Sequence, residues 1–526
     1  MSYFETSFWP RSHYQNMEKS NGNICKSICT SIVIGFFMAL FVMSVWNVSF
    51  HRPGKSYVIL LDSSREVVHR TSPRFLSFGL DSSLLRDMKN FPIHDERFVN
   101  LARHLSPAFV RIGGTSADCL LFNETVLGDS VARRSPVDGG DISNFTLTDT
   151  DYLSIYDFTR KAGLRMLFDL NVLIRTPDNQ WHDSNARKII TFSKGQEMEI
   201  DWQLGNEPNS FNFVFGRGVP AAQLGKDYIH LRTLLNTLGY ESSILVGPEA
   251  NHIGDPDDKG VHYATEFLEN DGQSVDFATW HQYYLNGREA KVMDFISPAV
   301  FNRLPAEINS FQRGINSSGR NVKMWLSETS SAYGGGAPEL SDRYVAGFLW
   351  LDKLGYSASA GVNVVVRQSL FGGDYAMVAH DLVPNPDWWI SVLFKTLVSD
   401  KVLHLESANN NGTLRFYAHC TSESSLISGV PAVTVYGVNL DVHRAQIFIQ
   451  GSWMKKNAKI LLYILTGDFL KSREIRLNGD VLKLKPDGSL PPFTPVIIDP
   501  TQIITLPPLS MAFIVTHGAD IRACMP

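Results

Sequence analysis

Residues 202–210 read WQLGNEPNS, in which an apolar and aromatic run ends in a tight Asn-Glu-Pro turn. The run has the composition of a buried strand, and it ends by presenting a carboxylate, Glu207. Functional side chains gather at the carboxyl ends of the strands in a parallel barrel, so this pattern favours such a barrel over an ordinary surface loop. The prediction requires other apolar runs of the same kind along the chain.

Seven further apolar runs occur between residues 75 and 369, and helical spacing follows five of the eight runs. The eight runs are 75–81, 108–114, 164–171, 200–208, 243–249, 277–284, 323–330 and 362–369. The helical stretches are 95–105, 151–163, 223–239, 341–355 and 385–398. Alternation of strands and helices, with a count of eight, predicts a (β/α)₈ TIM barrel of the α/β class. An open doubly wound sheet is the alternative, but no glycine-rich phosphate loop follows the first run.

The chain changes character after residue 400, where short alternating runs are separated by turn residues. This spacing predicts an antiparallel β-sandwich, and the stretch SYVILLDSS at residues 56–64 is a strand that could pair with it. The predicted divisions are a tail (1–26), an apolar segment (27–46), a linker and strand joining the sandwich (47–73), the barrel (74–398) and the sandwich (399–526).

The segment from Ser27 to Trp46 carries no charge and is long enough for one helical membrane crossing. A transmembrane signal-anchor is the favoured interpretation, and a cleaved signal peptide is the alternative. Either one predicts a protein of the secretory pathway, membrane-anchored or secreted, that acts in the extracellular matrix or the lysosome. Glycosylation sequons agree with this; they are at Asn47, Asn123, Asn144, Asn316 and Asn411.

Composition excludes several classes of function. The 526-residue chain has 48 basic and 53 acidic residues and no basic tract, so a nucleic-acid partner is not expected. Five cysteines are too few for a disulfide scaffold. The sequence has no HExxH, paired CxxC or GxxxxGK[ST] pattern and no nucleophile elbow, so we expect neither metal nor cofactor.

Polar residues occur at the ends of most of the eight runs and are expected to face one mouth of the barrel. They are Asp81, Arg111, Thr115, Asp169, Asn171, Asn206, Glu207, His281, Tyr283, Glu328, Arg367 and Gln368. Glu207 on the fourth strand and Glu328 on the seventh would face each other across the mouth, as glycoside cleavage requires. We therefore predict that Glu207 is the acid/base and Glu328 the nucleophile. The alternatives are an ordinary Asn-Glu-Pro turn, and a structural ion pair of Glu328 with Arg111 or Arg367.

Five segments of the chain resemble glycoside hydrolase family 79, the heparanase family, and the similarity runs from about Arg74 to the C-terminus. The segments are WQLGNEPNSF (202–211), TWHQYYLNGR (279–288), ETSSAYGGGAP (328–338), LSDRYVAGFLWLDKLG (340–355) and VVVRQSLFGG (364–373). The resemblance implies a barrel plus a sandwich with an N-terminal strand, and a retaining endo-β-glucuronidase activity.

The resemblance also implies roles for particular residues. Glu207 matches the proton donor and Glu328 the nucleophile. Substrate-binding or supporting positions are Asp81, Thr115, Asn206, Asn209, His281, Tyr283 and Arg288. Gly334, Gly335 and Tyr375 match the group that holds the glucuronate carboxylate, and Cys420 and Cys524 match a family disulfide.

Two features depart from the family pattern. The stretch 123–148 is short and offers little to excise, so an uncut polypeptide is expected. The stretch 249–276 contains eight acids and one lysine, Lys259, and is expected to repel a densely sulfated polymer.

Three hypotheses about function remain. The first is a retaining endo-β-glucuronidase acting on heparan sulfate, with its carboxyls ~5 Å apart. The second is a hyaluronan-cleaving enzyme of the same family, and the third is a non-catalytic glycan-binding protein.

Overall fold

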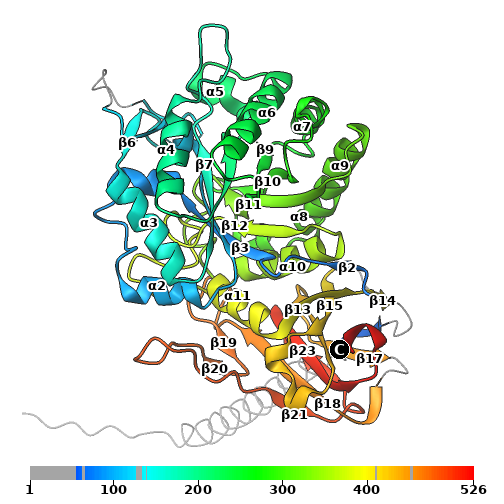
Figure 1. Cartoon of the computed structure of the whole chain (residues 1–526). Coiled ribbons are helices and arrows are strands. Elements are labelled where there is room, and N and C mark those ends of the chain that lie inside the picture. Colours follow the sequence, from blue (N-terminus) through cyan, green and yellow to red (C-terminus); the bar gives the residue numbers. More distant parts are fainter. Residues whose placement is uncertain are drawn as a thin grey trace, which may run out of the picture. The chain divides into compact units, whose positions relative to one another are not determined.

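The computed structural model describes residues 55–61, 66–125, 133–137, 139–408, 412–450 and 454–525. Eight parallel strands form one sheet in the order β8-β7-β4-β3-β12-β11-β10-β9. A parallel bridge between Trp202 and Leu245 joins the two ends of this order, and the Trp202 N–H donates to the Ile244 carbonyl over 2.9 Å. The sheet therefore closes into a barrel, seen in Figure 1, which confirms the predicted fold class for this part of the chain.

Each of the eight apolar runs forms one strand of the barrel. The strands are β3 (Leu76–Asp81), β4 (Phe109–Gly113), β7 (Arg165–Leu170), β8 (Ile200–Leu204), β9 (Val246–Ala250), β10 (Phe277–Asn286), β11 (Lys323–Tyr333) and β12 (Val364–Arg367). Alternate side chains of a strand face opposite sides. A separate buried cluster fills the inside of the barrel and includes the inward-facing Phe109, Leu167 and Trp325. It packs beneath the carboxyl ends of the strands.

Helices surround the strands in Figure 1. The long ones are α2 (Glu96–Arg103), α3 (Asp149–Lys161), α4 (Ser184–Gly195), α6 (Ala221–Thr237), α7 (Lys259–Asn270), α9 (Arg303–Ser317), α10 (Ala346–Ser359) and α11 (Pro386–Leu397). Two begin at side-chain caps, since Asp95 accepts the Arg97 N–H and Thr148 accepts the Asp151 N–H. The sequence predicted five of these helices and did not single out α4, α7 and α9.

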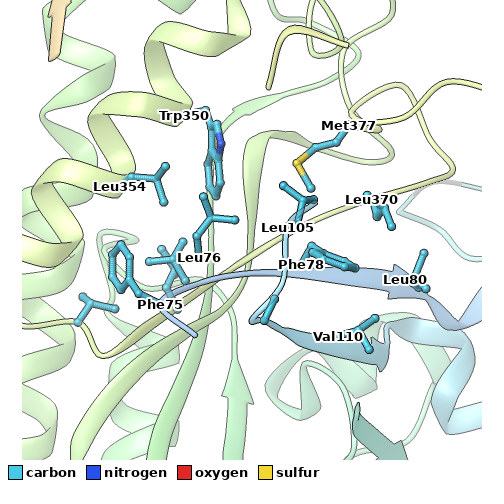
Figure 2. Close-up of a cluster of buried hydrophobic side chains, with 14 of the residues drawn as sticks. Phe75, Leu76, Phe78, Leu80, Leu105, Val110, Trp350, Leu354, Leu370 and Met377 are labelled. Atoms are coloured by element: carbon cyan, nitrogen blue, oxygen red, sulfur yellow. The ribbon is translucent and has the colours of Figure 1, made fainter. Parts of the chain in front are cut away.

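The outward side chains of the strands form the main core with these helices. Figure 2 shows Leu76, Phe78 and Leu80 of β3 in one row, with Trp350 and Leu354 of α10 near one end of it. All five are at most 3 % exposed. Burying each large apolar side chain stabilises the fold by about 1.5–3 kcal/mol. The other face of β3 is thereby fixed toward the barrel interior, where Asp81 ends the strand.

Most of the remaining strands form two antiparallel sheets, which confirms an antiparallel sheet domain after the barrel; the finer expectation of a β-sandwich stays a prediction. One sheet contains β14 (Leu405–Ala408), β1 (Lys55–Leu61), β17 (Ala445–Gln450) and β22 (Ile504–Leu506). The other contains β2 (His69–Arg70), β13 (Val398–Leu403), β15 (Leu414–Thr421), β16 (Ala432–Asn439), β23 (Ser510–Ala519), β18 (Met454–Thr466), β19 (Arg476–Leu477), β20 (Asp480–Val481) and β21 (Val496–Ile498). The N-terminal strand β1 pairs with β14, and Cys420 and Cys524 form a disulfide, as expected.

Helix α10 joins the barrel to these sheets. Its buried Asp352 accepts hydrogen bonds from Arg415 Nε at 2.7 Å and from the Tyr417 hydroxyl at 2.6 Å, both on β15. Helix α10 follows β11, the strand that carries Glu328. The contact with β15 therefore helps to hold this part of the barrel in place.

The predicted tail and the apolar segment 27–46 lie outside the described residues. Within the described ranges, no helix combines the length and the hydrophobicity that a membrane crossing needs. Residues 126–132 and 138 of the stretch 123–148 are also outside them, so the expectation of an uncut polypeptide stays a prediction, as do the domain boundaries.

Candidate active site

Glu207 is presented by a constrained turn after β8. Its backbone lies in the left-handed region, with φ 54° and ψ 51°, and Pro208 begins the short 3₁₀ helix Pro208–Ser210. Residues other than glycine rarely adopt this conformation, and outliers of this kind cluster at functional sites. The preceding Asn206 N–H donates to the buried Asp118 carboxylate over 2.9 Å. The turn therefore holds Glu207 in place, with its side chain 26 % exposed.

Glu328 lies within β11 and is held at both oxygens. Tyr283 donates its hydroxyl to Oε1 at 2.7 Å, and Arg111 Nη1 donates to Oε2 at 2.7 Å. The residue is 8 % exposed. Its carboxylate is thus oriented before any substrate binds.

The two glutamates face each other across a short gap. One side-chain ligand atom each of Glu207, His281 and Glu328 lie within 4.8 Å of one another. The predicted separation of ~5 Å suits a retaining glycosidase, whereas inverting enzymes space the two carboxyls by roughly 6.5–9.5 Å. A distance of at most 4.8 Å between one oxygen of each carboxyl is nearer to the retaining spacing than to the inverting one.

His281, on β10, bridges two carboxylates. Its Nδ1 lies 2.8 Å from Glu207 Oε1, and its Nε2 lies 2.8 Å from Glu249 Oε2. Burial by itself lowers the pKa of His281, but Glu328, Glu207 and Glu249 raise it more strongly, to about 10. A ring that donates from both nitrogens has no lone pair for a metal ion, so these three groups fit an acid/base site better than a metal centre.

Arg111 connects four strands at the base of the site. It is 1 % exposed, and besides Glu328 it contacts Gln203 Oε1 at 2.9 Å, Asn206 Oδ1 at 2.7 Å and Glu249 Oε2 at 3.3 Å. Burial raises the pKa of Glu328, but the charges of His281 and Arg111 and the Tyr283 hydrogen bond lower it more, so the net pKa is below its ordinary value. The predicted nucleophile is therefore kept ionised.

Three other predicted residues lie around this centre. Asp81 accepts the Gln368 side-chain amide at 2.9 Å and the Ser83 N–H at 2.9 Å, and burial raises its pKa. Thr115 is partly exposed and begins the 3₁₀ helix Thr115–Cys119 after β4. Asn209 bonds to the Asn251 backbone through both side-chain groups, which ties the Glu207 turn to the end of β9.

The two glycines of the predicted carboxylate-binding group lie in a loop after β11. Gly334 and Gly335 have φ of +74° and +89°, which L side chains rarely adopt, and a Cβ on either would meet no atom within 4 Å. The Asp374 N–H donates to the Gly335 carbonyl at 2.7 Å, so the loop is held beside Tyr375. Arg288 is exposed, and no hydrogen bond among the described residues joins its side chain to the two glutamates.

Two strand-end residues do not face the mouth, contrary to expectation. Arg367 bonds to Asp387 of α11 at 2.7 Å and lies over the Trp350 ring of α10, so it points outward. Asn171 bonds to the Leu120 carbonyl and accepts the Leu173 N–H, so it shapes a loop. The inward residue at the end of β12 is Gln368, because neighbours on a strand face opposite sides.

Comparison with known proteins decides the family. The profile of "Glycosyl hydrolase family 79, N-terminal domain" matches residues 81–355. The chain belongs to glycoside hydrolase family 79. A heparanase from Gallus gallus is 36 % identical over 88 % of this chain and 95 % of its own length. A hyaluronoglucuronidase from Hirudo nipponia is 30 % identical over 89 % of this chain and 99 % of its own length.

Solved structures of glycosidases share the fold of this family 79 enzyme. A 4-O-α-L-rhamnosyl-β-D-glucuronidase from Fusarium oxysporum has a TM-score of 0.63 at 15 % identity, over 87 % of this chain and 99 % of that one. At this identity the likeness concerns the fold alone.

The sequence reasoning missed one buried residue of the family 79 site. Glu249 is the penultimate residue of β9, is 0 % exposed and contacts both His281 and Arg111. The signal was available, since the fifth apolar run, SILVGPE, carries a glutamate near its end, as the fourth and seventh runs do.

We expect Tyr283→Phe to move the acidic limb of the pH profile upward. The Tyr283 hydroxyl donates to the ionised form of Glu328, so its loss raises the pKa of Glu328. A hydrogen bond to a charged group contributes about 1.5–3 kcal/mol, which corresponds to a shift of about 1–2 pH units. The measurement is kcat/KM against pH for both proteins. An unchanged acidic limb in a folded variant would show that Tyr283 does not tune Glu328.

Proposed function

We propose that this family 79 enzyme is a retaining endo-β-glucuronidase that cleaves internal glucuronide bonds of a glycosaminoglycan. The observation that carries the proposal is the pairing of Glu207 and Glu328 within 4.8 Å, each held by its own hydrogen-bond partner. A single structural ion pair does not explain the two donors on Glu328, and an ordinary turn does not explain why Glu207 lies within 4.8 Å of Glu328. The same features argue against a non-catalytic glycan-binding protein.

The geometry supports a two-step reaction. In the first step Glu328 attacks the anomeric carbon, the glycosidic C–O bond breaks, and Glu207 gives its proton to the leaving oxygen. This leaves a glycosyl ester on Glu328 and an ionised Glu207. In the second step water attacks the same carbon, Glu207 takes the water proton, and the ester bond breaks to restore the Glu328 carboxylate.

The glycine loop supports glucuronate as the sugar cleaved. Gly334 and Gly335 leave open space beside Tyr375, where backbone N–H groups and a phenol could hold a carboxylate without a buried cation. These roles, and those of Asp81, Thr115, Asn209 and Arg288 in substrate binding, belong to the proposal.

We propose heparan sulfate as the polymer, with hyaluronan as the second candidate. The name of the Gallus gallus relative supports the first and that of the Hirudo nipponia relative the second. The acidic stretch 249–276 repels sulfate less than its sequence suggests. Glu249 and Asp271 are buried, and Asp276 and Asp257 pair with Arg232 and Lys259.

Hyaluronan stays a candidate because Glu266 and Glu269 of α7 and Asp255 before it are still exposed. Exposed acids repel a polymer in proportion to its charge density, and hyaluronan carries no sulfate.

A two-polymer digestion tests the proposal. Heparan sulfate and hyaluronan are incubated separately with the enzyme, and the products are sized by chromatography, with Glu328→Gln as the inactive control. Shortening of heparan sulfate supports the full proposal. Shortening of hyaluronan alone rejects heparan sulfate as the substrate, and no shortening of either rejects the endo-β-glucuronidase function.

The proposed location is the secretory pathway, at the cell surface, in the matrix or in the lysosome. The disulfide between Cys420 and Cys524 supports it, because such bonds persist in oxidising compartments. Anchoring through residues 27–46 stays a prediction.

A further inference from the structure

Glu249 is a third carboxylate at the centre of the site, and it cannot touch a sugar. It lies on β9, is 0 % exposed, and its backbone has a positive φ of 60°. The Glu249 N–H donates to Thr279 Oγ1 at 3.0 Å, which fixes the strand end against β10. A buried, ionisable residue in a strained backbone conformation needs a reason to be there.

Three side chains around Glu249 converge on one of its oxygens. Oε2 lies 2.8 Å from His281 Nε2, 2.9 Å from Ser327 Oγ and 3.3 Å from Arg111 Nη2. Oε1 has no hydrogen-bond partner among the described residues. Burial raises the pKa of Glu249, but Arg111 and His281 lower it more strongly, so the group is ionised. An ionised carboxylate only accepts, so His281 Nε2 must carry a proton.

The other nitrogen of His281 faces the predicted acid/base. Nδ1 lies 2.8 Å from Glu207 Oε1 and 3.9 Å from Glu328 Oε1. Glu249, His281 and Glu207 therefore form a hydrogen-bonded line from the buried interior to the reacting centre. The charged groups that act on the ring are Glu328, Glu207 and Glu249, and two further groups contact these carboxylates: Arg111 at Glu249 and Glu328, and Tyr283 at Glu328.

We propose that Glu249 is a positioning residue that keeps His281 doubly protonated, so that its Nδ1–H holds Glu207 Oε1 and leaves Oε2 to carry the transferred proton. This proposal rests on the proposed retaining function. A neutral ring with its proton on Nε2 would present a lone pair at Nδ1 and would accept the proton that Glu207 has to give to the leaving group. The negative charge of Glu249 opposes that state.

Glu249 acts during the covalent intermediate as well as in the first step. Formation of the ester removes the negative charge of Glu328, which is one of the groups that keep His281 charged. Glu249 is not consumed in the reaction, so it keeps the ring positive while Glu207 is ionised and acts as the base. The role requires burial, because water at Glu249 would screen its charge from the ring.

Dependence on the leaving group tests this role. We compare wild type and Glu249→Gln on 4-nitrophenyl β-glucuronide, whose leaving group needs little protonation, and on methyl β-glucuronide, whose leaving group needs a full proton. We expect kcat/KM to fall by roughly 10- to 100-fold on the methyl substrate and by less than about 3-fold on the nitrophenyl one. Equal losses on both substrates would mean that Glu249 only supports the fold, and would overturn the proposal.

A nuclear magnetic resonance titration of His281 provides a readout that does not depend on activity. In wild type, the ring ¹⁵N signals should stay those of the doubly protonated form up to pH 8. In Glu249→Gln they should change to the neutral form below pH 8, since a neighbouring charge has been removed. Identical titration of the two proteins would overturn the proposal even if the enzyme proved inactive on every glucuronide.

Glu307→Gln is the matched control. Glu307 is a partly buried glutamate on α9, and burial raises its pKa to about 7, but no hydrogen bond or ion pair among the described residues joins it to His281. The control should keep the wild-type leaving-group dependence and the wild-type His281 titration. If wild type itself cleaves neither substrate and neither polymer, the proposed function fails, while the titration still decides the link between Glu249 and His281.

Discussion

Replacing Glu328 by Gln is expected to lower kcat on a fluorogenic β-glucuronide by roughly 10⁴-fold or more, because the variant lacks the nucleophile of the first step. The amide has nearly the shape of the carboxylate, and it can still accept the Tyr283 hydroxyl. Substrate binding should therefore change far less than kcat. The measurement is kcat and KM at the pH optimum of wild type.

The covalent intermediate gives the same prediction a direct test. A 2-deoxy-2-fluoro-glucuronosyl fluoride slows ester breakdown, so intact-protein mass spectrometry should show one added sugar on wild type, located on the peptide that contains Glu328. Glu328→Gln should take up no label. Glu339→Gln is the matched control, because Glu339 is an exposed carboxylate shortly after β11 that pairs with Lys471. A label on another residue, or a variant with more than a tenth of wild-type kcat, would reject Glu328 as the nucleophile.

The fold was readable from the sequence because its signal is repeated. Eight apolar runs separated by helical spacing leave few alternatives, and each run became one barrel strand. Each barrel strand is buried on both faces and therefore needs apolar residues, so the same apolar run recurs eight times in the sequence. The N-terminal strand β1 was visible for the same reason, since an isolated apolar run needs a sheet to join.

The site was readable only in part, because side-chain direction depends on details that no single run shows. Arg367 and Gln368 are neighbours, and only the strand parity decides that Gln368 faces the mouth while Arg367 faces α11. A bulge changes which side of the sheet the following side chains face. The pairing of β10 with β11 shifts between Trp280 and His281, which sets His281 opposite Glu328.

The contacts of His281 show the same limit. The structure sets His281 opposite Glu328, with Nδ1 3.9 Å from Oε1, but its two hydrogen bonds go to Glu207 and Glu249, which no single run indicates. Such contacts depend on how far the strands are staggered around the barrel, and the stagger is a property of the closed sheet.

Replacing Arg111 by Met is expected to destabilise the protein by about 3–5 kcal/mol at pH 7, because it leaves Glu249 and Glu328 as buried charges without their guanidinium partner. The loss of unfolding free energy should depend on pH. In wild type the pKa of both glutamates is lowered, so their contribution to stability is present above the unfolded pKa and is lost as pH falls. Without Arg111 the folded-state pKa of both glutamates rises, because less positive charge opposes the effect of burial, so this contribution is reduced at pH 7. The difference between the proteins should therefore be largest at pH 7 and smaller at pH 5, as measured from urea unfolding midpoints.

Arg415→Met separates this electrostatic effect from the loss of any buried arginine. Arg415 pairs with the buried Asp352 where α10 meets β15, and none of its hydrogen bonds among the described residues reaches the two catalytic candidates. Its replacement should also destabilise the protein, yet it should leave the acidic limb of the kcat/KM profile where it is in wild type. Arg111→Met should move that limb to higher pH, because the pKa of Glu328 rises when its closest ion-pair partner is removed. If Arg111→Met cost less than about 1 kcal/mol, or if its effect were the same at pH 5 and pH 7, the buried carboxylates would not be held ionised by Arg111.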